Sequence, residues 1–411
     1  MSRRVLLVMP TRTYRARAFL TAARRLNLEV VVASEESSTL SQLHPERELV
    51  VHLDDPEQAA DEARRLHGAG AVEAVVAVDE AGVLYAARLA EALGVAGNRP
   101  AAAAATRDKS RLRELLEAAG VPQPRWQLWR GEEAPQPADF PCVVKPLNQA
   151  ASRGVIRADD TEQLLAAGAR IRRMLQEGCE GEPGSQAPPG LLVERFVAGP
   201  EVAAEALLRD GQLLPLTIYD KPEPLNGPFF EETIYTLPST LSAAQAGAVW
   251  SRLGEAADAL GLTTGPIHAE FRLGERTPKL IDLASRSIGG RCSKAIHFSS
   301  GVTLEELILL NALGEPLPPT ELAEGGSGVM MLPVPVSGRL LAVVGRDEAL
   351  AVPGIEGLEV TIPIGGRVVG PPEGDRYLGF LFARTDGPAE AALALRQSYS
   401  KLSIEVEPNQ G

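Results

Sequence analysis

Cysteine is scarce in this chain of 411 residues, which contains only Cys142, Cys179 and Cys292. The three are scattered, and no two of them form a C-x-x-C pair. This pattern argues against a disulfide framework and against a cysteine zinc site, and it favours a reducing cytoplasm. We expect Cys292 to be a small packing residue rather than a nucleophile, because nothing around it in the sequence would lower the pKa of its thiol.

Long apolar runs are missing as well. The N-terminal run VLLVMP follows Arg3 and Arg4 and is only six residues long, which is too short for the core of a signal peptide. No later stretch approaches the length that a membrane span needs. The sequence therefore predicts a soluble, unprocessed cytoplasmic protein that does not bind membranes.

Positive charge is in deficit, with 41 Lys and Arg against 54 Asp and Glu and a formal net charge of -13. An excess of negative charge repels a phosphate backbone, so nucleic acid is not an expected partner. A small phosphorylated ligand stays compatible, because it needs only a local cluster of cations or a bound metal. The length corresponds to two or three domains of roughly 150 residues each.

The first hundred residues alternate short β-rich runs with helical patterns, which is typical of βαβ units and a parallel sheet. The strands lack apolar–polar alternation, as expected when helices cover both faces of a sheet. A dinucleotide site would show G-x-G-x-x-G after the first strand, but this chain reads MPTRTYRARAF there. The sequence therefore carries no fingerprint of an NAD site.

The rest of the chain mixes strands and helices. A strong helix former ends near Gly120 and Pro122, and FPCVVKPLNQAASRGVIRA then reads as strand, loop and strand. We interpret GCEGEPGSQAPPG as a mobile loop, because it is too poor in apolar residues to pack. Beyond Gly325 the chain becomes β-rich and rich in glycine and proline. Further helices are expected over 161–176, 242–260, 303–313 and 388–400.

A predicted hairpin over residues 268–286 carries the clearest chemistry. Alternation places Ala269, Phe271 and Leu273 on one face and His268, Glu270 and Arg272 on the other. On the second strand Ile281 and Leu283 are assigned to the apolar face, so Asp282 and Arg286 join the polar one. If the turn sets Arg272 opposite Leu280, Glu270 lies directly across from Asp282.

Two carboxylates in register repel each other, whereas a divalent cation between them reverses the sign of the interaction. Mg²⁺ needs only a few carboxylate oxygens, with waters and phosphates completing its octahedron. The pattern thus favours a Mg²⁺ site at Glu270 and Asp282, and a solvated hairpin face is the alternative. Gly289 and Gly290 leave backbone N–H groups open to an anion.

Cations for a triphosphate are available at two lysines. Lys145 ends the apolar strand VVK, which makes it harder to dismiss as surface charge than Lys109 on a helix. The loop NQAASRG over 148–154 has small side chains that would let its backbone close over phosphates, or it is a simple hairpin turn. In LLVERFVAGPE, Glu194 interrupts a strand and Glu201 follows a turn, where free backbone groups can pair with an adenine edge.

Taken in order, RDKSRLRELLEAAGVPQP, VVKPLNQAASRGV, LLVERFVAGPE, GPIHAEFRL and IDLASRSIGG resemble an ATP-grasp enzyme over residues 1–320. The resemblance implies an α/β and α+β fold with an N-terminal Rossmann-like pre-ATP-grasp domain and a β-rich C-terminal subdomain. The domains expected from it are 1–100, the pre-ATP-grasp βαβ domain; 101–190, the small lobe; 191–320, the large lobe with the metal site; and 321–411, the C-terminal subdomain.

Carried onto this chain, the family pattern assigns roles by position. Lys109 and Lys145 bind phosphates, and Ser152, Arg153 and Gly154 form the closing loop. Glu194, Phe196 and Val197 line the adenine hinge, Glu201 meets the ribose, and Glu270 and Asp282 bind Mg²⁺, with Mn²⁺ as an alternative. Arg286 meets the acyl phosphate or carboxylate. Two positions depart from the pattern, since Asp282 stands where glutamate is usual and Ala284 where many members place an asparagine metal ligand. They leave the number of metal ions open.

GVMMLPVP and YLGFLFA in the C-terminal block resemble the carboxylate–amine ligases related to bacilysin-type L-amino acid ligases. The resemblance implies an ADP-forming ligase that activates a carboxylate as an acyl phosphate and joins it to an amine. The substrates would be small-molecule carboxylates and amines, amino acids among them, and a homodimer is the assembly considered. Glu231 and Glu232 are candidates to hold the ammonium of an amino acid or belong to an acidic surface loop. His268 is a candidate phosphate ligand or fills a polar niche.

Two other activities stay open. One is an ATP-grasp carboxylase or purine-pathway ligase that acts through carboxyphosphate or on a ribosylamine. The other is a nucleotide-binding sensor that has lost catalysis, for which Ala284 is the only support in the sequence.

Overall fold

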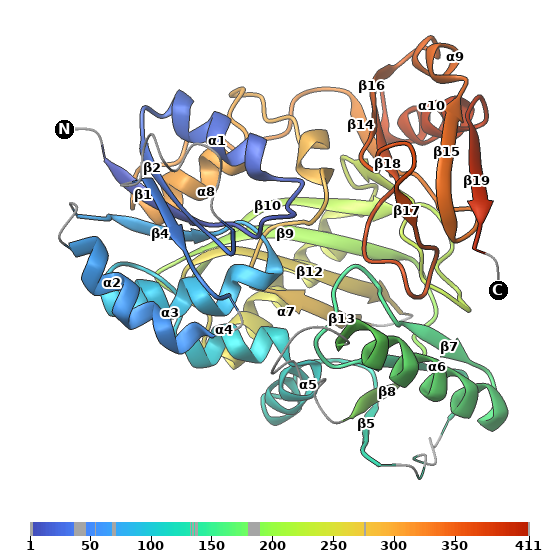
Figure 1. Ribbon diagram of the computed structural model, residues 1–411, viewed down its shortest axis with the longest axis horizontal. Helices are drawn as coiled ribbons and strands as arrows, with labels where there is room; N and C mark the ends of the chain where they lie inside the picture. The colour runs from blue at the N-terminus through green and yellow to red at the C-terminus, as the bar shows by residue number, and fades with distance from the viewer. Residues whose placement is uncertain are drawn as a thin grey trace.

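The structure is a computed structural model of the chain, and it describes residues 3–36, 47–53, 55–67, 71–131, 133, 135, 139–179, 190–274 and 277–409. Several layers of sheet and helix pack around one large central sheet (Figure 1). Within the described ranges, no helix is long and apolar enough to cross a membrane.

The first part of the chain forms the expected parallel sheet, with four strands in the order β3-β2-β1-β4. Strand β1 is buried on both faces, because Val5 and Leu7 belong to one core cluster and Leu6 and Val8 to another. This explains the missing apolar–polar alternation. The bounds are β1 (Arg4–Val8), α1 (Ala16–Arg25), β2 (Glu29–Ser34), β3 (Glu48–Val50), α2 (Ala59–His67), β4 (Ala74–Ala77) and α3 (Val83–Leu93), with 3-10 turns at Pro56–Gln58 and Glu80–Gly82.

A second, antiparallel sheet of four strands follows in the order β5-β8-β6-β7. Two short helices lead into it, and Asp108 caps the second by accepting the backbone N–H groups of Ser110 and Arg111. The predicted mobile loop lies almost wholly outside the described residues, which resume at Gly190. The bounds are α4 (Pro100–Arg107), α5 (Lys109–Ala118), β5 (Trp126–Trp129), β6 (Cys142–Pro146), β7 (Ile156–Ala158), α6 (Thr161–Cys179) and β8 (Leu191–Arg195).

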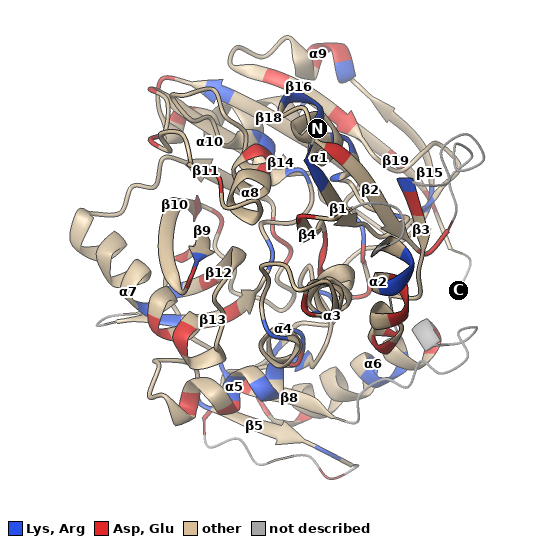
Figure 2. Ribbon diagram, turned by 90° about the vertical axis from the view of Figure 1, so that its left-hand side faces the viewer, with Lys and Arg blue, Asp and Glu red and all other residues tan. Residues whose placement is uncertain are grey.

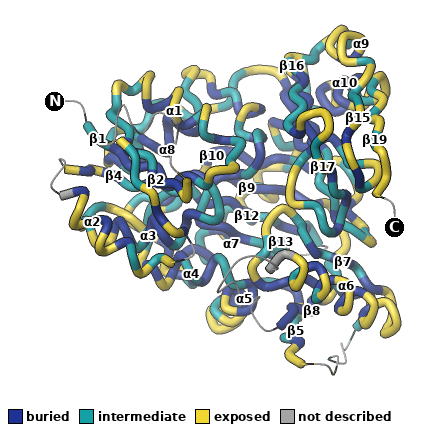
Figure 3. Tube along the Cα trace, in the orientation of Figure 1, coloured by how far each residue is buried: buried dark blue, intermediate teal, exposed yellow. Residues whose placement is uncertain are grey.

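The central sheet has eight strands in the order β13-β12-β9-β10-β11-β14-β18-β16. On β9, Ala203 and Leu207 pack toward the N-terminal layer, while Ala204 and Leu208 pack toward α5 and α7. Strands β9 and β12 therefore run through the buried centre (Figure 3). The bounds here are β9 (Glu201–Arg209), β10 (Gln212–Lys221), β11 (Ile234–Leu237), α7 (Ala243–Leu260), β12 (Gly265–Leu273), β13 (Pro278–Ala284) and α8 (Leu304–Ala312), with a 3-10 turn at Cys292–Ala295.

The C-terminal segment extends this sheet instead of standing apart from it. Strands β14, β18 and β16 continue the central sheet, and a three-stranded sheet β17-β15-β19 packs beside them with α10. The division of the chain into four units stays a prediction. The bounds are β14 (Gly326–Met331), β15 (Gly338–Val344), α9 (Arg346–Leu350), β16 (Ile355–Val360), β17 (Arg367–Val368), β18 (Gly379–Thr385), α10 (Pro388–Tyr399) and β19 (Ser403–Pro408).

The helices expected near 161–176, 242–260, 303–313 and 388–400 are present as α6, α7, α8 and α10, with ends shifted by a few residues at most. Cys292 is buried in the core beneath the N-terminal layer, which agrees with a packing role. Burial raises the pKa of its thiol. Along α2 and α5, basic and acidic segments alternate on the side seen in Figure 2, as expected for solvated helix faces.

Candidate active site

The hairpin β12–β13 places Glu270 directly opposite Asp282, as predicted. The expected register beyond this pair is wrong, because Arg272 faces Lys279 and not Leu280. A β-bulge at Ile281 causes the shift, since two residues of one strand there oppose one residue of the other.

The bulge also corrects the assignment of Ile281 to the apolar face. Its side chain is partly exposed and lines the pocket, whereas Leu280 and Leu283 are buried in the core. The backbone carbonyl of Ile281 accepts hydrogen bonds from Lys145 Nζ at 3.2 Å and from Arg113 Nη2 at 2.6 Å. The bulge thus presents a carbonyl to Lys145 on β6 and to Arg113 on α5.

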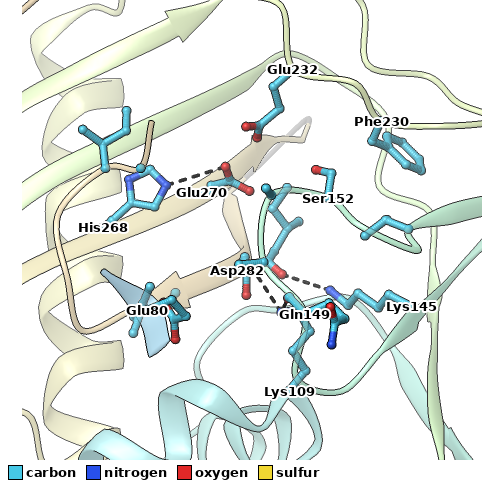
Figure 4. A pocket seen from close by; sticks show the side chains of 18 of the residues that line it. Glu80, Lys109, Lys145, Gln149, Ser152, Phe230, Glu232, His268, Glu270 and Asp282 are labelled. Carbon is cyan, nitrogen blue, oxygen red and sulfur yellow. Dashed lines mark hydrogen bonds and ion pairs between the residues drawn. The ribbon is translucent and has the colours of Figure 1, made fainter. Parts of the chain in front are cut away.

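Both predicted lysines reach the hairpin. Lys109 Nζ donates to the carbonyl of Gln149 at 2.8 Å and lies 3.6 Å from Asp282 Oδ2. Lys145 approaches from the side opposite His268 (Figure 4), and its Nζ lies 2.8 Å from Glu194 Oε2. Burial lowers the pKa of the Lys145 ammonium, although Glu194 opposes this change.

Glu194 is buried within an ion network and does not stand free beside an adenine edge. Its second oxygen accepts from Arg113 Nε at 2.5 Å, and the Arg113 side chain is only 1% exposed. Burial alone would raise the pKa of Glu194, but Arg113 and Lys145 outweigh it and lower the pKa. The sequence argument missed Arg113, whose partner is distant along the chain. This arginine connects α5, β8 and the hairpin.

The loop over 148–154 contacts both the pocket and the C-terminal segment. Ser152 lines the pocket, in a left-handed conformation. Arg153 Nε donates to the carbonyl of Glu373 at 3.1 Å, and the N–H of Gly154 donates to the carbonyl of Pro372 at 2.7 Å. Two of the three predicted loop residues are therefore fastened to the C-terminal segment.

An apolar slot lies next to the lysines. Phe196, Val197 and Phe230 line it, and the rings of Phe196 and Phe230 lie 6.2 Å apart. The guanidinium of Arg157 lies 4.6 Å from the centre of the Phe196 ring. Such a slot suits a flat, π-bearing group such as an adenine.

A buried lysine that sequence reasoning missed joins three carboxylates. Lys221 Nζ lies 2.6 Å from Glu201, 2.7 Å from Glu232 and 2.8 Å from Glu270. Burial alone would raise the pKa of Glu270, but Lys221 and His268 hold it well below its usual range. The pKa of Glu232 is raised to about 7, chiefly by burial. Lys221 ends an apolar strand, as Lys145 does, so the same signal was available.

Glu201 forms a second ion pair in addition to the one with Lys221, because its carboxylate accepts from Arg272 Nε at 2.7 Å.

His268 is buried, and its Nδ1 contacts the carboxylate of Glu205. Burial opposes the charged imidazolium, but Glu205 outweighs it and raises the pKa of His268 to about 9. The other ring nitrogen lies 3.7 Å from Glu270 Oε1. His268 therefore brings a positive charge to the pocket.

The far end of the pocket is built by the N-terminal layer, which sequence reasoning did not include. Arg286 Nε lies 3.0 Å from Glu80 Oε2. Burial would lower the pKa of Arg286, but Glu80 and Asp79 outweigh it and raise the pKa. Asp79 and Glu80 follow β4, and Arg12 follows β1, so all three lie at the carboxyl ends of parallel strands. Ligands of open α/β sheets bind at that edge, and this rule could have identified them.

Gly289 and Gly290 line the same pocket beyond Arg286.

The two adjacent glutamates that were predicted to hold an ammonium group differ in the cavities that they line. Glu232 faces the reaction pocket (Figure 4), whereas Glu231 lines an adjoining cavity, where its Oε1 accepts the N–H of Val334 at 3.3 Å.

One cavity of about 380 Å³ brings these groups together, a volume typical of small-molecule sites. Its lining residues come from the N-terminal layer, the small sheet, the central sheet and the C-terminal segment. They include most of the residues predicted from the sequence, namely Lys109, Lys145, Ser152, Glu194, Phe196, Val197, Glu201, Glu232, His268, Glu270, Asp282, Arg286, Gly289 and Gly290.

The donor set at the hairpin fits a divalent cation. The side chain of Asp282 is 38% exposed, and its recorded ion-pair partner, Lys109, lies at 3.6 Å. Asp282 is thus accessible, and Glu270, whose Oε1 accepts from Lys221, lies opposite it on the facing strand. An ion that keeps several waters needs only a few such carboxylate oxygens. Glu201, Glu232 and Glu270 also lie close enough to hold a metal, but the Lys221 ammonium already lies among them.

Three segments match known family models in chain order. Residues 20–97 match the ATP-grasp N-terminal domain, residues 138–295 the ATP-grasp domain and residues 330–407 the L-amino acid ligase C-terminal domain 2. The chain is an ATP-grasp ligase. The resemblance found in the sequence motifs is thereby confirmed, together with the mixed α/β fold.

Individual relatives agree with this assignment. A solved L-amino acid ligase from Bacillus licheniformis superposes with a TM-score of 0.79 and 26% identity, covering 99% of this chain and 100% of that one. The alanine–anticapsin ligase of Bacillus subtilis is 26% identical over 286 residues, which are 65% of this chain and 60% of that protein. The protein y4rH of Sinorhizobium fredii is 23% identical over 99% of this ligase and 84% of its own length.

Proposed function

We propose that this ligase joins the carboxylate of one amino acid to the amine of another, forming an amide, ADP and phosphate through an acyl phosphate. The relatives named as amino acid ligases and the C-terminal domain that they share with this chain support the proposal. The observation that carries it is the pairing of Glu270 and Asp282 beside Lys109 and Lys145 in a pocket that also contains Arg286.

ATP would lie between the small sheet and the central sheet. Phe196, Val197 and Phe230 would enclose the adenine, and Glu201 lies where the ribose would come near it. Lys109 and Lys145, which both line the pocket, would neutralise the negative charge of the phosphates. The small residues of the loop over 148–154, Ser152 among them, would let the loop close over the phosphates and exclude water.

Glu270 and Asp282 would hold Mg²⁺, or Mn²⁺ in its place. The ion would neutralise negative charge on the phosphate oxygens during transfer. Lys221 donates a hydrogen bond to one oxygen of Glu270 and so fixes the position of this carboxylate. His268 approaches the same oxygen of Glu270 and adds a second positive charge.

The substrate carboxylate would bind at Arg286 and at the backbone N–H groups near Gly289 and Gly290. One of its oxygens attacks the γ-phosphorus of ATP, the bond from that phosphorus to the bridging oxygen breaks, and ADP leaves. The amine then attacks the carbonyl carbon of the acyl phosphate and loses a proton, and phosphate leaves. Arg286 stabilises the negative charge that develops on the carbonyl oxygen.

The ammonium of a bound amino acid needs carboxylates. Asp79 and Glu80 lie at the end of the pocket next to Arg286, and Glu232 lies on its opposite wall. These three acids are the candidates for that role. Glu231 lines the adjoining cavity and takes no part in holding this group.

A release assay tests the proposal. Purified enzyme is incubated with ATP, Mg²⁺ and pairs of amino acids, phosphate is measured, and the product is identified by mass spectrometry. We expect phosphate release that depends on both amino acids and a product whose mass is their sum less one water. Release that depends on bicarbonate, or ATP binding with no release for any pair, would contradict the proposal.

A further inference from the structure

A second cavity, here called the side chamber, adjoins the reaction pocket. It lies between the loop over 148–154, the ends of β11 and β14, and the C-terminal segment 369–377. Ala151, Ser152, Phe230, Glu232, Asp375 and Tyr377 line both cavities, so the two adjoin. In Figure 4, Phe230, Ser152 and Glu232 lie together on one side of the pocket, where the two cavities adjoin.

The walls of this side chamber are mainly apolar. Met331 and Leu332 are buried, and Val334 and Val369 are half-buried. Pro371 and Pro372 close it on the side of the C-terminal segment. Such walls favour a hydrocarbon chain over a phosphate or a sugar.

The two glutamates that line the chamber differ in their partners. Glu231 makes one hydrogen bond, to the backbone of Val334, and no ion pair among the residues that the structure describes. Its neighbour Glu232 has Lys221 as a partner. Burial raises the pKa of Glu231, as expected for a carboxyl group without a cation nearby.

Two further charges lie at the exposed rim of the chamber. Asp375 adds a second carboxylate and Arg376 a positive charge, and neither forms an ion pair within the described part of the chain. The inner carboxylate of Glu231 and the rim carboxylate of Asp375 therefore outnumber the one rim cation. A cationic group that reaches Glu231 would supply its missing partner.

We propose that the side chamber receives the side chain of one amino acid substrate and selects a long side chain with an apolar stem and a cationic end. Lysine, ornithine and arginine belong to this class. The inference rests on the proposed amino acid ligase activity and adds the substrate class to it. Glu231 is the specificity-determining residue, and the apolar walls bind the methylene groups of the stem.

The test compares substrates whose side chains differ in charge. With one partner amino acid held fixed, kcat/KM is measured by ADP release for lysine, arginine, norleucine and glutamate. The wild-type enzyme should prefer lysine or arginine over norleucine and should use glutamate least. Glu231→Gln should lower kcat/KM for the cationic substrates by about ten- to a hundredfold and leave norleucine within about twofold, the range for a hydrogen bond to a charged group.

Glu348→Gln is the matched control, because it removes the same charge from an exposed position on α9 that forms no ion pair among the described residues. This control should leave the ratio of kcat/KM between lysine and norleucine unchanged. A second variant, Val334→Phe, fills the chamber without altering charge. It should reduce activity with all long side chains and spare alanine. This variant keeps the inference testable if Glu231→Gln fails to fold.

The outcomes separate the two proposals. Amide formation with an unchanged lysine-to-norleucine ratio in Glu231→Gln, or a wild-type preference for norleucine, overturns the chamber assignment and leaves the ligase activity standing. If no amino acid pair gives an amide, the ligase proposal fails and the chamber assignment fails with it.

Discussion

Glu270 and Asp282 face each other across β12 and β13, one beside the buried Lys221 and the other beside Lys109. Lys221 thus lies within hydrogen-bond distance of Glu270, and Lys109 lies within ion-pair distance of Asp282. The flanking lysines reduce the repulsion between the two acids, and an ion between them would remove the remainder.

Loss of either carboxylate should abolish turnover without unfolding the protein. We expect Glu270→Gln and Asp282→Asn to lower Mg²⁺-dependent ADP release by at least about a thousandfold, because the transferring phosphoryl group loses its charge neutralisation. Asp347→Asn, at an exposed position on α9, is the control. Circular dichroism would verify the fold, and normal Mg²⁺-dependent turnover in either site variant would refute the metal assignment.

Lys145→Ala should act mainly on nucleotide binding. The variant removes a buried cation that faces the pocket, so we expect ATP affinity measured by calorimetry to fall by about tenfold or more. Arg113 would still neutralise Glu194, which limits the loss of stability. An unchanged ATP affinity in a folded variant would exclude Lys145 from the phosphate site.

Sequence reasoning succeeded where chemistry follows local periodicity. The alternation along β12 placed His268 and Glu270 on one face, and the strand end at VVK identified Lys145. It failed where the structure depends on contacts between distant segments. The bulge at Ile281 changes the register by one residue, and no pattern in the sequence of the strand predicts this bulge.

The missed residues show the same limit. Arg113 lies on a helix that looks solvated in sequence, yet it is buried because Glu194, 81 residues away, pairs with it. Lys221 ends an apolar strand as Lys145 does, but its role depends on the acids that β9, β12 and the segment before β11 bring to it. Asp79 and Glu80 follow β4, and the rule for open α/β sheets indicates them only if the N-terminal layer is taken as part of the site.

The stability of the protein should depend on His268 in alkaline solution. Its pKa is raised to about 9 in the folded state by Glu205, against about 6.5 when unfolded. A raised pKa means that the stabilisation is fully present below pH ~6.5 and is lost as the pH rises through ~9. The free energy of unfolding should therefore fall over this window by roughly 2–4 kcal/mol in the wild type.

The matched measurement is urea unfolding of wild type and His268→Gln between pH 6 and 10. The variant has no group that titrates at this position, so its curve should be flatter across the window. Parallel curves for the two proteins would show that the Glu205–His268 pair does not control the stability of the fold at high pH.

Gly154 should be sensitive to substitution for two separable reasons. Its φ is 73°, a conformation that alanine adopts at a cost of about 1–2 kcal/mol. A Cβ there would also lie 2.8 Å from the Met174 side chain and 3.1 Å from Pro146. We expect Gly154→Ala to lower stability and to displace the loop from Pro372, which should raise the KM for ATP.

Gly120→Ala is the matched control, because its φ is 70° and no atom lies within 4 Å of a Cβ there. This variant carries the backbone cost alone and should leave the KM for ATP unchanged. The difference in unfolding free energy between the two variants then measures the crowding around the loop. If both lose the same stability and keep the same KM, Gly154 is not required for its tight packing, and the loop tolerates a side chain at the point where it meets the C-terminal segment.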